Sequence, residues 1–471
     1  MAERTRPSTS TDQPRSPRQG VALAILLTCQ LMLIVDLTVM NVALPHIERE
    51  LGFSPTGLAW VINAYTLPFG GFLLLGGRAG DWFGQRRVFL LGVVAFTLSS
   101  LLGGLADSAE MLIAARALQG VGAAAAGPNT LALVAGVFVE PRSKARALGL
   151  SAVVASGGFG LGLVMGGLLT EWFSWRAVLF INVPIGVLIA VSVRRFVGES
   201  LRRPNRLDVA GALTAVGGAG AVVYGFIRVA EQGWGVVDGI GCIVAGLLLM
   251  VVFVFVEARI RMPLMPLWLF GERNRAGAFL NFFLGPMITI STFFFLTQFM
   301  QTVLDYSALM TGLAFLPMAC SIFVMARLMP MLLERWGPKP LVLVGAVLLV
   351  AGLLWLIGLS SGDTYFTGLF GPLVLVGLGG GVGFSPLVVV IMTTVGQEDA
   401  GVAGGVLQTM QQLGAAVGLA LLVTIATMMG GARGGLGHAA FIKGMSSAFV
   451  AAAVLAAMTF AVGLTFRGRA G

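Results

Sequence analysis

Residues 77–87 read Gly-Arg-Ala-Gly-Asp-Trp-Phe-Gly-Gln-Arg-Arg and lie between two long apolar runs. Asp81 to Arg86 follows the pattern acid-x-aromatic-Gly-x-base, and the same pattern returns 253 residues later, from Glu334 to Lys339. Each copy occupies a short polar loop after the second apolar span of a six-span unit. The repeat therefore predicts two related helical bundles, and duplicated halves with a site at their interface are typical of transporters.

Outside these loops the chain is strongly apolar. Hydrophobic residues make up 57% of its 471 residues and charged residues 11%, and the mean hydropathy is +0.92. A soluble domain carries roughly 25% charged residues, so we expect an all-α polytopic membrane protein built from apolar spans of about 20 residues. Fourteen spans are expected near residues 20–44, 57–77, 88–106, 109–137, 146–170, 177–193, 208–227, 236–256, 276–300, 309–333, 340–359, 366–395, 400–428 and 445–466.

The expected organisation has five parts. They are a disordered cytoplasmic tail at 1–19, an N-terminal six-helix bundle at 20–195, two linking transmembrane helices at 205–260, a C-terminal six-helix bundle at 275–466, and a cytoplasmic C-terminus at 467–471. The basic residues support this order, because 24 of the 30 lie on the side of the N-terminal tail and five on the other, with Arg116 inside a span. Positive charge marks the cytoplasmic side, so both termini are expected in the cytoplasm.

The chain lacks the features of several other classes. It contains no Gly-x-x-x-x-Gly-Lys-[Ser/Thr] motif, so ATP hydrolysis is not expected. The two histidines, His46 and His438, lie in loops with no metal-ligand spacing around them. The basic loops are short and lie beside the membrane, which argues against nucleic-acid binding. We expect neither enzymatic activity nor a cofactor or metal, and the sequence does not set the oligomeric state.

Several phrases carry a family resemblance. Residues 77–87 resemble the loop 2–3 signature of the major facilitator superfamily. Residues 116–122, Arg-Ala-Leu-Gln-Gly-Val-Gly, resemble a second signature of its drug:proton antiporters. Residues 36–45, Asp-Leu-Thr-Val-Met-Asn-Val-Ala-Leu-Pro, look like a signature of the fourteen-helix branch, and the phrases at 175–184 and 399–403 are typical of it.

The resemblance, which covers the chain from Gly20 to Phe466, implies proton-coupled efflux of drug-like or antibiotic-like amphipathic compounds across the bacterial plasma membrane. One departure concerns span 5, where the antiporter signature has a Gly-Pro pair and this chain has Gly162-Leu163. The missing proline leaves open a facilitator or a differently coupled exporter of a metabolite. A membrane sensor or assembly partner that keeps the fold and transports nothing is the second alternative. Gly158, Gly162 and Gly166 keep a four-residue spacing, which still allows close helix approach.

Asp36 is the one acid well inside an apolar span. It lies about as deep as Arg116 on span 4, roughly 11–12 Å below the outer helix ends at 1.5 Å per residue. Burial favours a neutral carboxyl and a nearby guanidinium favours a charged one, so Asp36 is a candidate proton carrier with Arg116 as its regulator. The alternative is a static ion pair that fixes helix packing.

Two further groups of residues are candidates for function. The resemblance implies a gating latch in the repeated loops, for which the alternative is charge anchoring of topology; its residues are Gly77, Asp81, Gly84, Arg86 and Arg87, with Glu334 and Lys339 in the second copy. Polar residues on the spans are candidates for a substrate cavity, for which the alternative is interhelical hydrogen bonding. They are Asn41, Gln119, Tyr224, Asn281, Gln298, Gln301, Gln408 and Gln411.

Overall fold

The computed structural model describes residues 17–138, 140–200, 208–234, 237–260, 263–396, 398–430 and 437–467. Most of the two expected tails, at 1–16 and 468–471, lies outside these residues. The first helix begins at Pro17, so the last residues assigned to the N-terminal tail are helical. The described residues contain helices and no strand, and fourteen helical spans are long and apolar enough to cross a membrane. The prediction of a polytopic helical membrane protein with fourteen spans is therefore confirmed.

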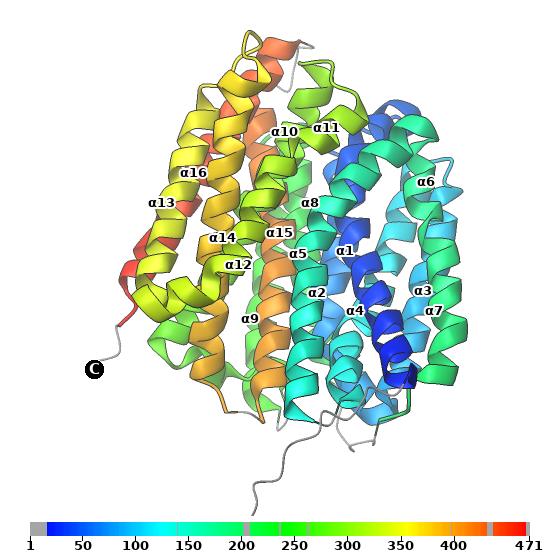
Figure 1. Ribbon diagram of the computed structural model, residues 1–471. Coiled ribbons are helices and arrows are strands. Elements are labelled where there is room, and N and C mark those ends of the chain that lie inside the picture. The colour runs from blue at the N-terminus through cyan, green and yellow to red at the C-terminus, as the bar shows by residue number, and fades with distance from the viewer. Residues whose placement is uncertain are drawn as a thin grey trace, which may run out of the picture.

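The spans form two six-span bundles, joined in chain order by two linking helices (Figure 1). The N-terminal bundle contains α1 (Pro17–Leu51), α2 (Ala59–Phe83), α3 (Gln85–Gly104), α4 (Ala109–Val137), α5 (Pro141–Trp172), and α6 (Trp175–Phe180) with α7 (Asn182–Phe196). The linking helices are α8 (Val209–Gln232) and α9 (Val237–Arg259). A short helix η1 (Leu267–Phe270) leads to the C-terminal bundle of α10 (Arg273–Thr302), α11 (Ala308–Ala314) with α12 (Leu316–Trp336), α13 (Pro338–Ile357), η2 (Tyr365–Leu369) with α14 (Phe370–Thr393), α15 (Ala400–Gly430) and α16 (His438–Leu464).

Prolines explain two spans that are divided into two helical pieces. A proline has no N–H to donate to the carbonyl four residues earlier. Pro184 lies just after the junction of α6 and α7, and Pro317 lies just after the junction of α11 and α12. The first junction sets the position of Asn182, the first residue of α7.

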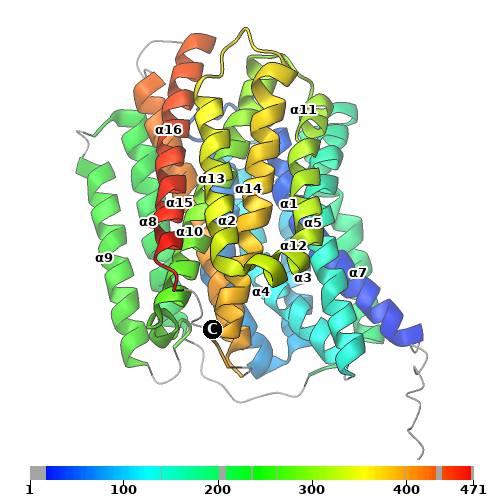
Figure 2. The same cartoon turned by 60° about the vertical axis from the view of Figure 1, so that its left-hand side comes forward.

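The described ends of the chain lie on the same face of the molecule, as an even number of spans requires (Figure 2). We call this the terminal face, and the other side the opposite face. The linking helix α8 packs against α2 of one bundle and α15 of the other, whereas α9 packs mainly along α8. The linking pair is therefore attached to both bundles through α8.

The two bundles touch near the opposite face through α5 and α11. A Cβ built on Gly312 would lie 2.4 Å from the Leu163 carbonyl oxygen, and one on Gly167 would lie 2.6 Å from the Ala308 carbonyl oxygen. Glu171 accepts a hydrogen bond from the backbone N–H of Leu309 at 2.9 Å. Toward the terminal face α5 and α12 diverge (Figure 1), and their side chains there are largely exposed. Among the described residues, this pair of helices and the contacts of α1 with α10 and α11 hold the two bundles together toward the opposite face.

The glycines of span 5 line the contact with α1. A Cβ on Gly162 would lie 1.8 Å from the Thr38 Oγ1, and one on Gly166 would lie 2.8 Å from the Val39 Cα. Gly158 faces Leu31 in the same way, with its Cβ position 3.0 Å from the Cδ1. The close approach that this spacing allows is present, and it occurs in a helix that continues through Leu163 without a proline.

Candidate functional site

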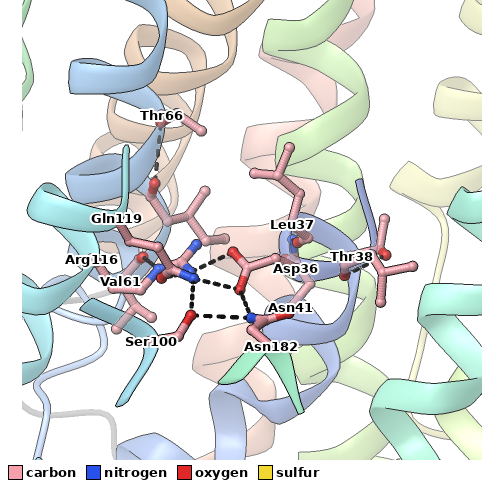
Figure 3. A network of polar contacts seen from close by, with 12 residues as sticks. Asp36, Leu37, Thr38, Asn41, Val61, Thr66, Ser100, Arg116, Gln119 and Asn182 are labelled. Atoms are coloured by element: carbon pink, nitrogen blue, oxygen red, sulfur yellow. Dashed lines mark hydrogen bonds and ion pairs between the residues drawn. The ribbon is translucent and has the colours of Figure 1, made fainter. Parts of the chain in front are cut away.

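Asp36 lies in the middle of α1 and is 1% exposed. Its Oδ2 accepts a hydrogen bond from the Arg116 Nη1 at 2.7 Å, which forms a buried ion pair. Its Oδ1 accepts from the Gln119 Nε2 and from the Asn182 Nδ2, each at 2.8 Å (Figure 3). Three donors therefore surround the carboxylate, so the arrangement is matched to an ionised Asp36.

Arg116 reaches Asp36 from α4 and has further partners. Its Nη1 also donates to the Gln119 Oε1 at 2.7 Å, and its Nε donates to the Val61 carbonyl of α2 at 3.2 Å. Its guanidinium carbon lies 4.4 Å from the centre of the Tyr65 ring, within the range of a cation–π interaction. Arg116 would thus keep two acceptors and an aromatic face if Asp36 lost its charge.

Ser100 on α3 completes the network. Its hydroxyl oxygen accepts from the Gln119 Nε2 at 2.7 Å and from the Asn182 Nδ2 at 3.2 Å. The network joins α1, α2, α3, α4 and α7 at one depth, inside the N-terminal bundle (Figure 3). The sequence analysis placed Asp36 and Arg116 at one depth. The two form a direct bond inside a packed bundle, because α4 lies against both α1 and α2.

The first copy of the repeated loop contacts a residue that sequence reasoning did not select, Glu199. The Glu199 Oε1 accepts from the Arg86 backbone N–H at 3.0 Å, and its Oε2 lies 3.7 Å from the Arg86 Nε and 3.8 Å from the Arg87 Nε. The Arg86 Nη1 also donates to the Val197 carbonyl at 3.1 Å. The loop between α2 and α3 is therefore held to the segment that follows α7.

Asp81, which the resemblance placed in a latch, makes few contacts in this arrangement. Its Oδ1 accepts from the Gln85 Nε2 at 3.3 Å, and among the described residues it forms no ion pair within 4.0 Å. Gly77, the other gate candidate on α2, has only the Pro128 ring near its Cβ position. The tight contacts of this helix with α4 fall at Gly76 and Gly80 instead, where a Cβ would lie 2.2 Å from the Ala124 carbonyl oxygen and 1.8 Å from the Asn129 Oδ1.

The two repeated loops share a backbone feature. Gly84 ends α2 with φ +106°, and Gly337 ends α12 with φ +70°, a conformation that favours glycine. Their surroundings differ, because the Lys339 Nζ donates to the Leu464 and Phe466 carbonyls at 3.1 and 2.6 Å, at the end of α16. Glu334 is exposed. The second loop is thus held by its basic residue, Lys339, and the first by Glu199.

A large pocket of about 770 Å³ opens at the opposite face between α8, α10, α15, α16 and the connection from α1 to α2. Its lining includes aromatic, carboxylate and amide side chains, among them Phe294, Phe295, Phe441, Glu48, Glu231 and Gln298. Gln298 is the one predicted cavity residue that lines it. The phenylalanines and the two acids carry no sequence signal that separates them from ordinary packing and loop residues.

The other predicted cavity residues lie elsewhere. Gln119 belongs to the Asp36 network, and the Gln301 Nε2 donates to the Val42 carbonyl at 2.9 Å between α10 and α1. Asn41 and Asn281 are buried and donate to the Leu37 and Thr459 carbonyls at 3.5 and 3.4 Å. Tyr224 is 41% exposed, and its ring lies 6.3 Å from that of Trp60. Gln408 and Gln411 on α15 are partly exposed and line neither of the two described pockets.

A repeated pair of helical bundles that spans a membrane, with a buried ion pair inside one of them, defines a secondary transporter architecture. The family model described as Major Facilitator Superfamily matches residues 26–419, and the chain belongs to this family. The resemblance identified from the sequence is confirmed.

Curated relatives and a solved structure agree with this assignment. The chain is 42% identical to the puromycin resistance protein pur8 of Streptomyces alboniger, over 88% of this chain and 83% of that protein. It is 41% identical to the cephamycin export protein CmcT of Amycolatopsis lactamdurans, over 86% and 84%. A bacterial homologue of the human lysosomal transporter Spinster has the same fold, with a TM-score of 0.65 at 16% identity, over 95% of this chain and 97% of that one.

Proposed function

We propose that this chain exports amphipathic, drug-like or antibiotic-like compounds from the cytoplasm across the bacterial plasma membrane, in exchange for protons. The relatives named for puromycin resistance and cephamycin export support the substrate class. The buried network around Asp36 is the observation that carries the proton coupling. In this proposal the chain is not an enzyme, its partners are substrate, protons and lipid, and the terminal face is cytoplasmic.

Asp36 is the proposed proton carrier, and Arg116 is its regulator. A proton on Asp36 removes the charge that holds the Arg116 Nη1 at 2.7 Å. Arg116 can then rely on Gln119, the Val61 carbonyl and the Tyr65 ring, so the cost of leaving a buried cation unpaired is reduced. The five helices that meet at the network then lose one of their strongest links, and this loosening accompanies the change between the two access states.

The large pocket is the proposed substrate site on the release side. Its volume of about 770 Å³ falls in the range of about 300–1,000 Å³ that is typical of pockets for small molecules. Phe294, Phe295 and Phe441 offer apolar surface, and Gln298, Glu48 and Glu231 offer polar groups. This combination suits an amphipathic compound with an apolar body and a polar or cationic end.

The gate is proposed at the terminal face, where α5 and α12 diverge. At the same face the segment from Gly77 to Arg87, where α2 ends and α3 begins, changes partners as the bundles move, with Glu199 holding Arg86 and Arg87 in the present arrangement. Asp81, whose hydrogen bond among the described residues is with Gln85, would gain a further partner when the terminal face closes. Glu334 and Lys339 would act at the equivalent point of the other bundle.

Accumulation of fluorescent cationic and neutral compounds in inverted vesicles, with and without an imposed pH gradient, tests the function. We expect the wild type to accumulate at least one cationic dye when the gradient is present. Asp36→Asn should bind the dye and fail to accumulate it, whereas Asp107→Asn, the same change in an exposed loop, should behave as the wild type.

Other results would separate the alternatives. Accumulation by the wild type that ignores the pH gradient would favour a differently coupled exporter. An absence of flux for every compound would favour a sensor or assembly partner. Full proton-driven accumulation by a folded Asp36→Asn protein would rule out Asp36 as the carrier.

A further inference from the structure

A second group of buried charges lies where the linking helices meet the terminal-face end of α2. It is separate from the Asp36 network. Glu257 is near the end of α9 and is 2% exposed, and Asp208 caps the start of α8 and is 5% exposed. Arg78 on α2 lies within electrostatic reach of both carboxyl groups. The group therefore brings two buried acids together with one base.

In each of the two carboxyl groups, one oxygen accepts a hydrogen bond from a backbone N–H. The Asp208 Oδ1 accepts from the Gly211 N–H at 2.8 Å, and the Glu257 Oε2 accepts from the Met265 N–H at 3.0 Å. The remaining oxygens, Asp208 Oδ2 and Glu257 Oε1, are buried and accept no hydrogen bond from the residues that the structure describes. Buried polar atoms almost always have a partner, so two such atoms in one place require an explanation.

The two remaining oxygens lie close to one point beside Gly211. A Cβ built on Gly211 would lie 2.3 Å from the Asp208 Oδ2 and 2.8 Å from the Glu257 Oε1, and the two carboxyl groups are within hydrogen-bonding reach. Two carboxylates cannot bond to each other, because neither carries a donor; a protonated carboxyl can donate to a carboxylate. One proton would therefore satisfy both oxygens at once.

We propose that Asp208 and Glu257 bind one proton between them, and that this proton holds the linking helices α8 and α9 against the terminal-face end of α2. With the proton, the pair carries one negative charge, which Arg78 balances. Without it, two buried negative charges share one guanidinium, and like charges at this distance oppose each other. Arg78 also donates to the Pro263 carbonyl in the segment after α9, so it contacts the linker directly.

Neighbouring charges do not replace the proton. From α2, Asp81 also lies near Arg78 and competes for it. On α9, the Arg259 guanidinium lies 5.6 Å from the centre of the Phe255 ring. On α10, Arg275 donates to the carbonyls of Leu269, Trp268 and Thr394. Among the described residues, Arg78 is thus the base that faces the pair.

Release of the proton would loosen the contact of the linking helices with the end of α2, which is part of the proposed gate. Arg78 lies with Asp81 on the last turns of α2, just before Gly84. Met265, which donates to Glu257, also lines a small apolar pocket of about 290 Å³ between α8, α9 and the two bundles. Proton occupancy at the terminal face would thus change both the position of α9 and the end of α2. This inference does not require proton-coupled export.

Infrared spectroscopy of the full chain in lipid nanodiscs tests the shared proton. We expect a band of a protonated carboxyl that disappears as the pH is raised. Glu257→Gln and Asp208→Asn should each remove it, since an amide binds no proton and the remaining acid then pairs with Arg78. Asp208→Asn keeps a good helix cap, which protects the fold. Asp238→Asn, the same change at the exposed end of α9, should keep the band, as should Asp36→Asn. A wild-type band that survives in Glu257→Gln, or that only Asp36→Asn removes, would overturn the proposal.

A distance measurement tests the mechanical consequence. Spin labels on cysteines at the exposed positions Trp82 and Phe255 would report the separation of α2 and α9, after replacement of the three native cysteines by serine. The distance should lengthen with rising pH in the wild type and in Asp238→Asn. It should stay at its acid value in Glu257→Gln, whose amide donates permanently to Asp208. The proposal that the shared proton holds α9 against α2 would be refuted by a wild-type distance that does not change with pH. It would also be refuted by a distance that changes with pH equally in Glu257→Gln.

Discussion

Asn182 donates a hydrogen bond from its Nδ2 to the Oδ1 of Asp36 across 2.8 Å, although 146 residues separate the two along the chain. The contact depends on the junction between α6 and α7, which places Asn182 at the first position of α7. It gives the carboxylate a donor from the last span of the N-terminal bundle. The hydrogen bonds of the proposed proton site therefore depend on the position of α7 as well as on that of α4.

The role of Asn182 can be measured by two substitutions. Asn182→Ala removes a buried donor, and we expect a loss of about 1–3 kcal/mol in the free energy of unfolding. Asn182→Asp places a second carboxyl beside Asp36, so one of the two should remain protonated; its stability should be near that of the wild type at acid pH and should fall as the pH rises. Thermal unfolding in detergent across a pH series provides the measurement. Equal stability of Asn182→Ala and the wild type would mean that this donor does not hold the network.

Substitutions in the proposed gate should change the transport rate without changing substrate affinity. Asp81→Asn should slow transport and leave substrate affinity nearly unchanged, because the residue is remote from the large pocket. Glu199→Gln should also alter the rate, by weakening its contacts with Arg86 and Arg87, while changing stability by less than about 1 kcal/mol for a partly exposed pair. Glu140→Gln, at an exposed position of the same face, is the matched control. Loss of binding with normal turnover of bound substrate would contradict the gate.

The repeated glycines predict unequal costs for the same substitution. Both Gly84→Ala and Gly337→Ala force an alanine into a positive φ, which costs of order 1–2 kcal/mol. Only at Gly84 would the new Cβ also meet the Glu199 Oε1, at 2.7 Å, whereas the space beside Gly337 is open. The melting temperature should therefore fall further for Gly84→Ala. Equal melting temperatures of the two variants would mean that the Glu199 side chain moves aside without a measurable loss of stability.

Contact between α5 and α11 predicts how closure of the opposite face can be blocked. Gly312→Val would drive its side chain into the Leu163 backbone, where even a Cβ lies 2.4 Å from the carbonyl oxygen. The bundles should separate at this face, and a cysteine placed at Leu309 should then react faster with a membrane-impermeant thiol reagent. Gly362→Val, in a loop with no atom closer than 4.0 Å to the Cβ position, serves as the control. Unchanged reactivity would show that other contacts keep the face closed.

Topology gives a prediction that is independent of mechanism. Because the basic residues divide 24 to five between the two sides, reporter fusions at both termini should report a cytoplasmic location. A periplasmic signal from either end would contradict either the even number of spans or their orientation.

Much of the fold followed from local chemistry. Apolar length identified fourteen spans, and the acid-x-aromatic-Gly-x-base repeat identified two bundles whose loops share a positive φ at Gly84 and Gly337. Depth could be estimated for Asp36 and Arg116 because each lies on a long helix of constant rise. Their ion pair was therefore predictable as a possibility, although its other partners were not.

What the sequence determined by itself is the membrane class, the number of spans, their duplication and the two buried charges, because hydropathy and charge act over short stretches of chain. Only the tertiary structure decided that Asn182 and Ser100 complete the Asp36 network, that Glu199 holds Arg86, and that Asp208 faces Glu257. The physical reason is that a short polar side chain on an apolar helix has no periodic signal of its own. Its partner is set by how helices distant in sequence pack and by which face each turns inward.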